Sequence, residues 1–312
     1  MTTISAAMVK ELRDKTGAGM MDCKQALTEN NGDIEASVDW LRKKGLSKAA
    51  KKSGRVAAEG LIGVAVDGPV GTMVEVNSET DFVARNAQFQ DMVRDISKLA
   101  LQAGGDLSRL LAMPFPGKTI SVEDHVKEMI ATIGENMSVR RTAELRATAD
   151  GIVVDYVHNR VAEGLGKMGV LVALESTGDK AKLAEFGRQV AMHIAAAAPL
   201  AVTVEDLDPA VIERERQIYV EQAKATGKPQ DIIEKMAEGR LRKEFFQQVV
   251  LTQQVFVIDG KATVEEAVKE AAGSVGAPIR ITGFVRYALG EGIDKKEEDF
   301  AAEVAAAVSG TR

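Results

Sequence analysis

The residue types that most often carry chemistry are sparse and scattered in this chain of 312 residues. The three histidines are His125, His158 and His193, and they show none of the short spacings typical of metal ligands. The sequence also lacks a Gly-Lys-Ser/Thr phosphate loop, a dinucleotide fingerprint and a nucleophile elbow. Carboxylates are plentiful, but no pair stands out for acid–base work. We therefore expect no catalytic site, no metal site and no cofactor, and a protein that acts by binding.

One loop superficially resembles a phosphate cradle, because Gly17 and Gly19 lie close together in it. No strand is predicted before these glycines and no Gly-Lys-Ser/Thr follows them, which excludes that interpretation. Met20 and Met21 come next. Either methionine could fill the core between two helices, or it could offer a flexible thioether contact to a partner. The residues alone leave these two alternatives equal.

The most informative stretch is Thr80-Asp81-Phe82-Val83, which follows a strand that ends near Val76 and precedes a helix. Ser78 or Thr80 could cap that helix, and Asp81 would suit the positive end of its dipole. A large apolar residue such as Phe82 at this boundary is either the first core residue of the helix or an exposed wedge for a partner. From the residues alone, the core interpretation is favoured.

The chain also repeats one plan: two strands, a helix and a later third strand. The second strands match at Gly71 and Gly169, which are 98 residues apart. The helices match at Phe89 and Phe186, which are 97 residues apart. Because the two offsets nearly agree, we predict two copies of one structural unit.

The two copies differ after the second strand. The first continues as Glu79-Thr80-Asp81-Phe82, whereas the second has Ser176-Thr177-Gly178-Asp179. The scaffold therefore does not need an Asp-Phe pair at this corner. This difference is evidence within the chain that Phe82 does more than pack.

Composition limits the class of protein. A hydrophobic content of 45% with 28% charged residues is typical of a globular domain, and the length allows two or three domains. The net charge of −6 argues against a dominant nucleic-acid surface. Cys23 is the only cysteine, which excludes an internal disulfide and suits a reducing compartment. No signal peptide or membrane-spanning run is evident, so we expect a cytoplasmic protein.

The periodicities predict an α+β fold. Residues 1–46 would form a three-helix bundle like a ubiquitin-associated domain, with Gly45 ending the third helix, and residues 47–59 would be a basic linker that acts as a tether. Residues 60–149 and 150–288 would be the two repeated α/β subdomains. Within the second, an insertion at about 205–250 reads as a protruding antiparallel helical hairpin. Residues 289–312 would be a C-terminal module with an amphipathic helix at 299–308.

Three blocks of residues resemble one known family. They are Thr80-Asp81-Phe82-Val83, the N-terminal block from Leu12 to Lys24, and Ile133-Gly134-Glu135-Asn136. In this order they are similar to the signatures of bacterial elongation factor Ts proteins, the guanine-nucleotide exchange factors for elongation factor Tu. The resemblance runs over essentially the whole chain. The first two blocks are specific together, whereas Ile-Gly-Glu-Asn alone would be a weak signal.

The resemblance implies a function and a set of contacts. Asp81 and Phe82 would intrude beside the magnesium site of Tu, with Thr80 and Val83 completing the motif. Weaker partner contacts would come from Met20, Ile133, Gly134, Glu135, Asn136 and His158. The helical hairpin and the C-terminal segment would also touch Tu, and dimers occur in the family, so a homodimer is a further candidate partner. Magnesium and GDP would belong to Tu, so the resemblance assigns this chain no cofactor, no nucleic acid and no membrane.

Two other classes remain open from the residues. A ubiquitin-associated-like adaptor would recruit a protein through residues 4–45 without any effect on nucleotides. An enzyme could instead use a cleft between the two copies.

Overall fold

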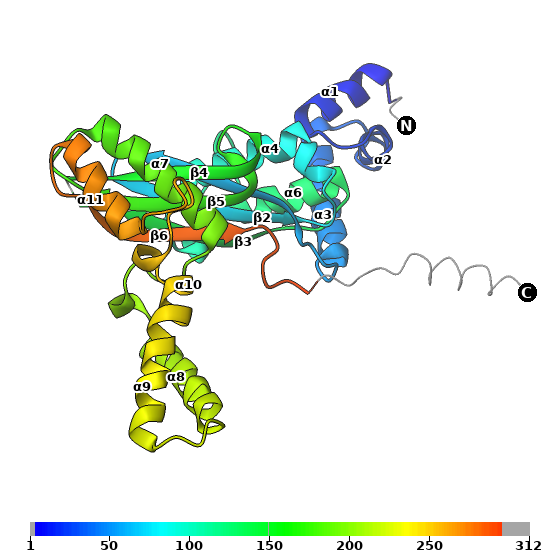
Figure 1. The fold of residues 1–312 in the computed structure, drawn as a ribbon. Coiled ribbons are helices and arrows are strands. Elements are labelled where there is room, and N and C mark those ends of the chain that lie inside the picture. Colours follow the sequence, from blue (N-terminus) through cyan, green and yellow to red (C-terminus); the bar gives the residue numbers. More distant parts are fainter. Residues whose placement is uncertain (1–3, 149, 295–312) are drawn as a thin grey trace, which may run out of the picture.

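The computed structural model describes residues 4–148 and 150–294. Within this part, six strands form one antiparallel sheet in the order β3-β2-β1-β5-β4, with β6 also paired to β5. Helices cover the sheet, a small helical bundle lies at one end, and a helical hairpin projects away from it (Figure 1). The mixed helix and antiparallel sheet agrees with the predicted α+β class.

The strands lie close to where alternation and β-branched residues predicted them. Their bounds are β1 (Glu59–Asp67), β2 (Val70–Ser78), β3 (Met137–Arg146), β4 (Gly151–Ala162), β5 (Leu165–Glu175) and β6 (Arg280–Ala288). In both halves, the third strand pairs with the second on the side opposite the first: β3 on β2, and β6 on β5.

Each helix around the sheet begins after a residue whose side chain accepts a hydrogen bond from the first turn. These helices are α4 (Ala87–Ala100), α5 (Leu107–Ala112), α6 (Val122–Ile133), α7 (Lys180–Ala197) and α11 (Val264–Val275). A capping box of Thr263 and Glu266 begins α11. One apolar core lies between the first three strands and α4 to α6, and a second lies between the last three strands, α7 and α11.

A third core lies between the two halves of the sheet. Ile62 and Met73 from the first half pack there with Val153 and Leu171 from the second. The two glycines that revealed the repeat both face this core. A Cβ atom on Gly71 would lie 2.6 Å from Val153 Cγ1, and one on Gly169 would lie 2.9 Å from Ile62 Cγ2. Each half therefore needs a glycine where the other half approaches most closely.

The N-terminal bundle contains α1 (Ala6–Thr16), α2 (Met20–Glu29) and α3 (Ile34–Lys52). Two expectations for this region are wrong. Gly45 does not end a helix but lies inside α3, where a Cβ would sit 3.1 Å from Ala131 Cβ of α6. Residues 47–52 are not part of a tether, because α3 continues through them and packs along α6. The packing partner, which the sequence pattern did not reveal, extends the helix.

The hairpin contains α8 (Pro209–Lys224) and a second arm that begins with α9 (Gln230–Arg240). Asp208 caps α8, and Pro209 occupies its first position, where proline is favoured. The second arm is not one uniform helix. It passes through a π-helical turn (Leu241–Phe246) before the short α10 (Gln247–Val249). Two 3₁₀ turns, Val204–Asp206 and Leu251–Gln253, join the hairpin to the body.

A buried histidine joins α7 to the base of this hairpin. His193 is fully buried, and its Nδ1 accepts a hydrogen bond from the Val257 N–H at 3.2 Å. Its Nε2–H therefore donates to Gln254 Oε1 at 2.8 Å, and Gln254 Nε2 donates to the Gln248 carbonyl at 2.6 Å. Burial lowers the pKa of His193 below its usual 6.5. The neutral ring is the form that fits this network.

We predict that folding stability depends on the neutral form of His193. A lowered pKa in the folded state means that the stabilisation is fully present above pH 6.5 and is lost as the pH falls from 6.5 toward the lowered value. Urea unfolding at pH 7.5 and 5.5 should show wild type losing more free energy of unfolding than His193→Gln does. His158→Gln, at an exposed histidine, is the control and should behave like wild type. Equal pH dependence in wild type and His193→Gln would contradict this prediction.

Candidate functional site

The corner between β2 and α4 holds Asp81 and Phe82 away from the body of the protein. Phe82 is 73% exposed, and the next residue, Val83, is 4% exposed and belongs to the core under α4. A 3₁₀ turn (Val83–Arg85) separates the corner from α4, and Asn86 caps that helix through its side chain. The expectation that Ser78 or Thr80 would be the cap is wrong, as is the core interpretation of Phe82.

The residue before Asp81 is tied to a distant segment. Glu135, just beyond α6, accepts two hydrogen bonds from Thr80: one from the backbone N–H at 2.9 Å and one from the hydroxyl at 2.6 Å. Ser78 Oγ donates to the Thr80 carbonyl at 3.0 Å, which closes the turn on the strand side. The two motifs lie 55 residues apart in the chain and meet here. The corner is thus fixed on both sides of the Asp-Phe pair.

A second set of contacts joins the same two segments, and here Asn136 is the donor. Asn136 N–H donates to the Glu79 carboxylate, and Asn136 Nδ2 donates to the Arg55 carbonyl at 2.8 Å. The Arg55 guanidinium lies 3.5 Å from the same Glu79 carboxylate. Gly134 ends α6 with a φ of +94°, and its carbonyl accepts a hydrogen bond from Lys52. The left-handed turn at this glycine aims Glu135 and Asn136 at the corner.

Asp81 itself is free to meet a partner. Its carboxylate lies 3.7 Å from Arg85, and both side chains are at least half exposed. An ion pair in such exposure contributes little to stability. Asp81 and Phe82 are therefore neighbours at an exposed corner, and the contacts that fix this corner are made by other residues.

The equivalent corner in the second half of the sheet is covered. Gly178 packs so closely on α11 that a Cβ there would lie 2.4 Å from the Val275 carbonyl oxygen. The Asp179 N–H donates to the same carbonyl at 2.9 Å. A large residue at this position would displace α11. The repeat thus presents one open corner with Phe82 and one closed corner with glycine.

Comparison with known proteins shows the family of this chain. The sequence model of the family described as Elongation factor TS matches residues 79–291. A protein from Parvibaculum lavamentivorans named Elongation factor Ts is 62% identical over 99% of this chain and 100% of its own length. Proteins of the same name from Rhizobium etli and Rhodospirillum centenum are 61% and 58% identical, over 99% and 98% of this chain and 100% and 99% of their own lengths.

The chain belongs to the elongation factor Ts family. Translation elongation, a step of protein biosynthesis, is the process in which this elongation factor acts.

The other residues singled out from the sequence lie elsewhere in this elongation factor Ts fold. Met20 is the first residue of α2 and is 60% exposed, and Met21 is 74% exposed, so the core interpretation is wrong for both. His158 is exposed on β4, where its Nδ1 lies 3.0 Å from the Tyr156 hydroxyl. Ile133 is half-buried at the end of α6. These positions form separate surfaces, and only the block ending in Asn136 is joined to the Thr80 corner by hydrogen bonds.

Sequence reasoning missed a buried carboxylate in β2. The Glu75 side chain is fully buried on the sheet face opposite α4, and Arg140 and Arg141 of β3 both contact it. Glu75 also accepts from the Gly290 N–H at 2.9 Å and from Asn77 Nδ2 at 3.0 Å. Desolvation opposes ionisation, but these donors outweigh it, and the pKa of Glu75 lies below its usual 4.5. The one signal in the sequence was a charge between Val74 and Val76.

The described residues contain neither a membrane-spanning helix nor a cluster of metal-binding side chains. No helix in this part of the chain is long and apolar enough to cross a membrane. Among the same residues, no group of three or more His, Cys, Asp or Glu side chains could hold a metal ion.

We predict that Glu75→Gln lowers the free energy of unfolding by about 2–3 kcal/mol at pH 7, because the partly buried Arg140 and Arg141 lose their charged acceptor. The lowered pKa means that this difference is present above pH 4.5 and shrinks as the pH falls through the folded-state value. Chemical denaturation at pH 7 and pH 4 measures it. Glu265→Gln, which removes an exposed helical ion pair, is the control and should change stability by less than about 0.5 kcal/mol. A Glu75→Gln protein as stable as wild type at pH 7 would refute the role of this network.

Proposed function

We propose that this chain is a nucleotide exchange factor that acts on elongation factor Tu in the cytoplasm and performs no substrate chemistry of its own. It binds the GDP-bound form of Tu, opens the nucleotide site and allows GTP to replace GDP. Membership of the elongation factor Ts family supports this proposal. The single observation that carries it is the Phe82 ring, which is 73% exposed on a corner fixed by Thr80 and Val83.

The mechanism follows from reciprocal coupling. If this protein weakens GDP binding to Tu, then GDP weakens the binding of this protein to Tu by the same factor. Phe82 enters between helices of the nucleotide-binding domain of Tu, while Asp81 disturbs the hydrogen bonds around the magnesium ion of Tu. Loss of that ion leaves the phosphate charge uncompensated, so GDP leaves. Magnesium and GDP belong to the partner throughout.

The free energy of burying Phe82 limits how much this one side chain can change the affinity of Tu for GDP. Burying a Phe side chain contributes roughly 1.5–3 kcal/mol. A tenfold change in affinity requires about 1.4 kcal/mol. Phe82 alone therefore accounts for a change of about tenfold to a hundredfold, and other surfaces must supply the rest. Met20, His158 and the block Ile133-Gly134-Glu135-Asn136 are the further contacts that we propose.

Because the backbone around Phe82 is fixed, the contact energy of this side chain is available for binding. An aromatic side chain on a mobile loop would lose conformational entropy when it inserted, and that loss would reduce the binding free energy. Here Thr80 is held by Glu135 and Val83 is held in the core before any partner arrives. The contact energy of Phe82 can then act on the partner.

We predict that Phe82→Ala lowers kcat/KM for catalysed release of a fluorescent GDP analogue from purified Tu by about tenfold or more. The physical reason is the loss of the apolar contact. Leu200→Ala, at another exposed apolar residue (63% exposed), is the matched control and should leave release unchanged. Unfolding curves check that both variants are folded.

The same assay separates the proposal from the adaptor alternative. An adaptor acting through the N-terminal bundle would be indifferent to Phe82→Ala and sensitive to Met20→Ala. Exchange that is unaffected by Phe82→Ala would contradict the proposed insertion of Phe82 between helices of Tu.

We also predict that Thr80 and Glu135 act as one unit. Thr80→Val and Glu135→Gln should each slow GDP release severalfold, and the double variant should be no worse than the slower single one, because each change breaks the same contact. Glu128→Gln, on the same helical segment but in contact with Lys118, is the control. Fully additive effects in this cycle would show that the contact does not position the corner.

A further inference from the structure

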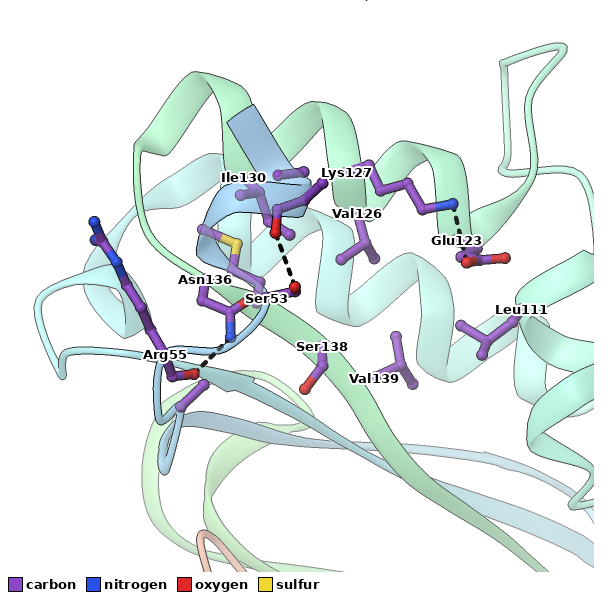
Figure 2. A pocket seen from close by; sticks show the side chains of 14 residues that line it. Ser53, Arg55, Leu111, Glu123, Val126, Lys127, Ile130, Asn136, Ser138 and Val139 are labelled. Atoms are coloured by element: carbon purple, nitrogen blue, oxygen red, sulfur yellow. Dashed lines mark hydrogen bonds and ion pairs between the residues drawn. The ribbon is translucent and has the colours of Figure 1, made fainter. Parts of the chain in front are cut away.

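A groove of about 710 Å³ lies between the end of α3, α6 and the first residues of β3. Its floor is apolar and formed by residues that point into the same space, among them Leu111, Val126 and Val139 (Figure 2). Its rim is polar and includes Arg55, Lys127 and Glu123, and Glu123 pairs with Lys127 at 2.9 Å. Among the residues that line it, only Asn136 belongs to the contacts of the proposed exchange mechanism.

The last described residues lie near the edge of this groove, on the other face of the sheet. The Gly290 backbone lies against Ala58, where a Cβ would sit 2.5 Å from the Ala58 carbonyl oxygen, and Ala57 lines the groove. Arg140 donates to the Glu291 carbonyl at 2.8 Å, and Arg140 directly follows the groove residue Val139 in β3. β3 is an edge strand of the sheet, so a chain leaving here can pass around it.

The residues that follow have the right length and pattern to fill the groove. Residues 295–312 are 18 residues that start four positions after Glu291. Phe300, Val304 and Val308 recur every four residues, which would place them on one face of a helix. A helix of ten residues at 299–308 would be about 15 Å long. About four residues of extended chain reach 13 Å, enough to bring Phe300 round the edge of β3.

Charge favours the same occupant. Glu297, Glu298, Asp299 and Glu303 make the beginning of this segment acidic. The end of α3 and the residues after it carry Lys51, Lys52 and Arg55 beside the groove residues Ala50 and Ser53. Opposite charges on a segment and on the rim of its groove would orient it with the apolar face inward.

We propose that residues 295–312 bind in this groove of the same molecule in the absence of a partner, with Phe300 on the apolar floor between α6 and β3. The groove includes Asn136 and Arg55, the same two residues that contact Glu79 beneath the Asp81-Phe82 corner. The bound segment therefore touches the support of that corner. The inference does not depend on the exchange function.

A disulfide trap in the full-length chain tests this inference. The variant Ser138→Cys/Ala301→Cys places one thiol at the groove and one beside Phe300. The native Cys23 is buried, and burial raises the pKa of its thiol, so it does not compete. Lys167→Cys/Ala301→Cys is the control pair, since the Lys167 carbonyl contacts Leu289 near the same chain exit but lies outside the groove. With oxidised glutathione, we expect the groove pair to close about tenfold faster than the control pair.

Charge reversal at the rim gives the second measurement. Lys127→Glu, added to the groove pair, should slow closure severalfold. Lys269→Glu is the matched control, because Lys127 and Lys269 each pair with a glutamate four residues earlier on their helix. Equal rates for the two cysteine pairs, or closure unaffected by Lys127→Glu, would overturn the proposal. A disulfide between two copies would also overturn it and would assign the groove to the segment of a second molecule.

Discussion

The hydrogen bonds from Thr80 to Glu135 are the constraint on which the exposed corner depends. They attach the residue before Asp81 to the end of α6, while Val83 on the other side is held in the core. The backbone that carries the exposed Phe82 ring is therefore ordered before any partner arrives. The conformational entropy of this backbone is already lost on folding, so the contact energy of the Phe82 ring remains available for binding.

This arrangement explains why the two signature blocks belong together. Glu135 and Asn136 lie after α6, and their function in the fold is to hold Glu79 and Thr80 at the end of β2. Gly134 makes the connection through a left-handed turn that other residues adopt at a cost. A weak motif in the sequence is therefore a structural support for a stronger one. Its effect on a partner would then pass through the corner as well as through direct contact.

The two halves of the sheet show how a repeated unit acquires different roles. Gly71 and Gly169 occupy equivalent places and let the two halves approach each other. The corners after β2 and β5 are equivalent in the chain but not in the structure. At one, Gly178 allows α11 to pack over the backbone; at the other, Phe82 stands exposed. The difference between the copies separates an exposed residue, Phe82, from the residues needed for packing.

Two buried polar networks join segments that are far apart in the chain. Glu75 holds the residues after β6 to β2 and β3, and His193 holds the base of the helical hairpin to α7. Both need one protonation state, because the groups around them offer donors to Glu75 and one donor and one acceptor to His193. Such networks add specificity, since an alternative packing would leave a buried polar group without a partner.

The sequence by itself determined the strands, most helix starts and the existence of the repeat. These features depend on local periodicity and on capping residues such as Asp208 and Thr263, which act within a few positions of the chain. It also marked Phe82, because the second copy lacks its equivalent. Only the tertiary structure decided that Phe82 is exposed, that α3 continues past Gly45, and that Glu135 binds Thr80. Each of these depends on a neighbour tens of residues away, and the energy of such a contact exists only once the chain has brought the two segments together.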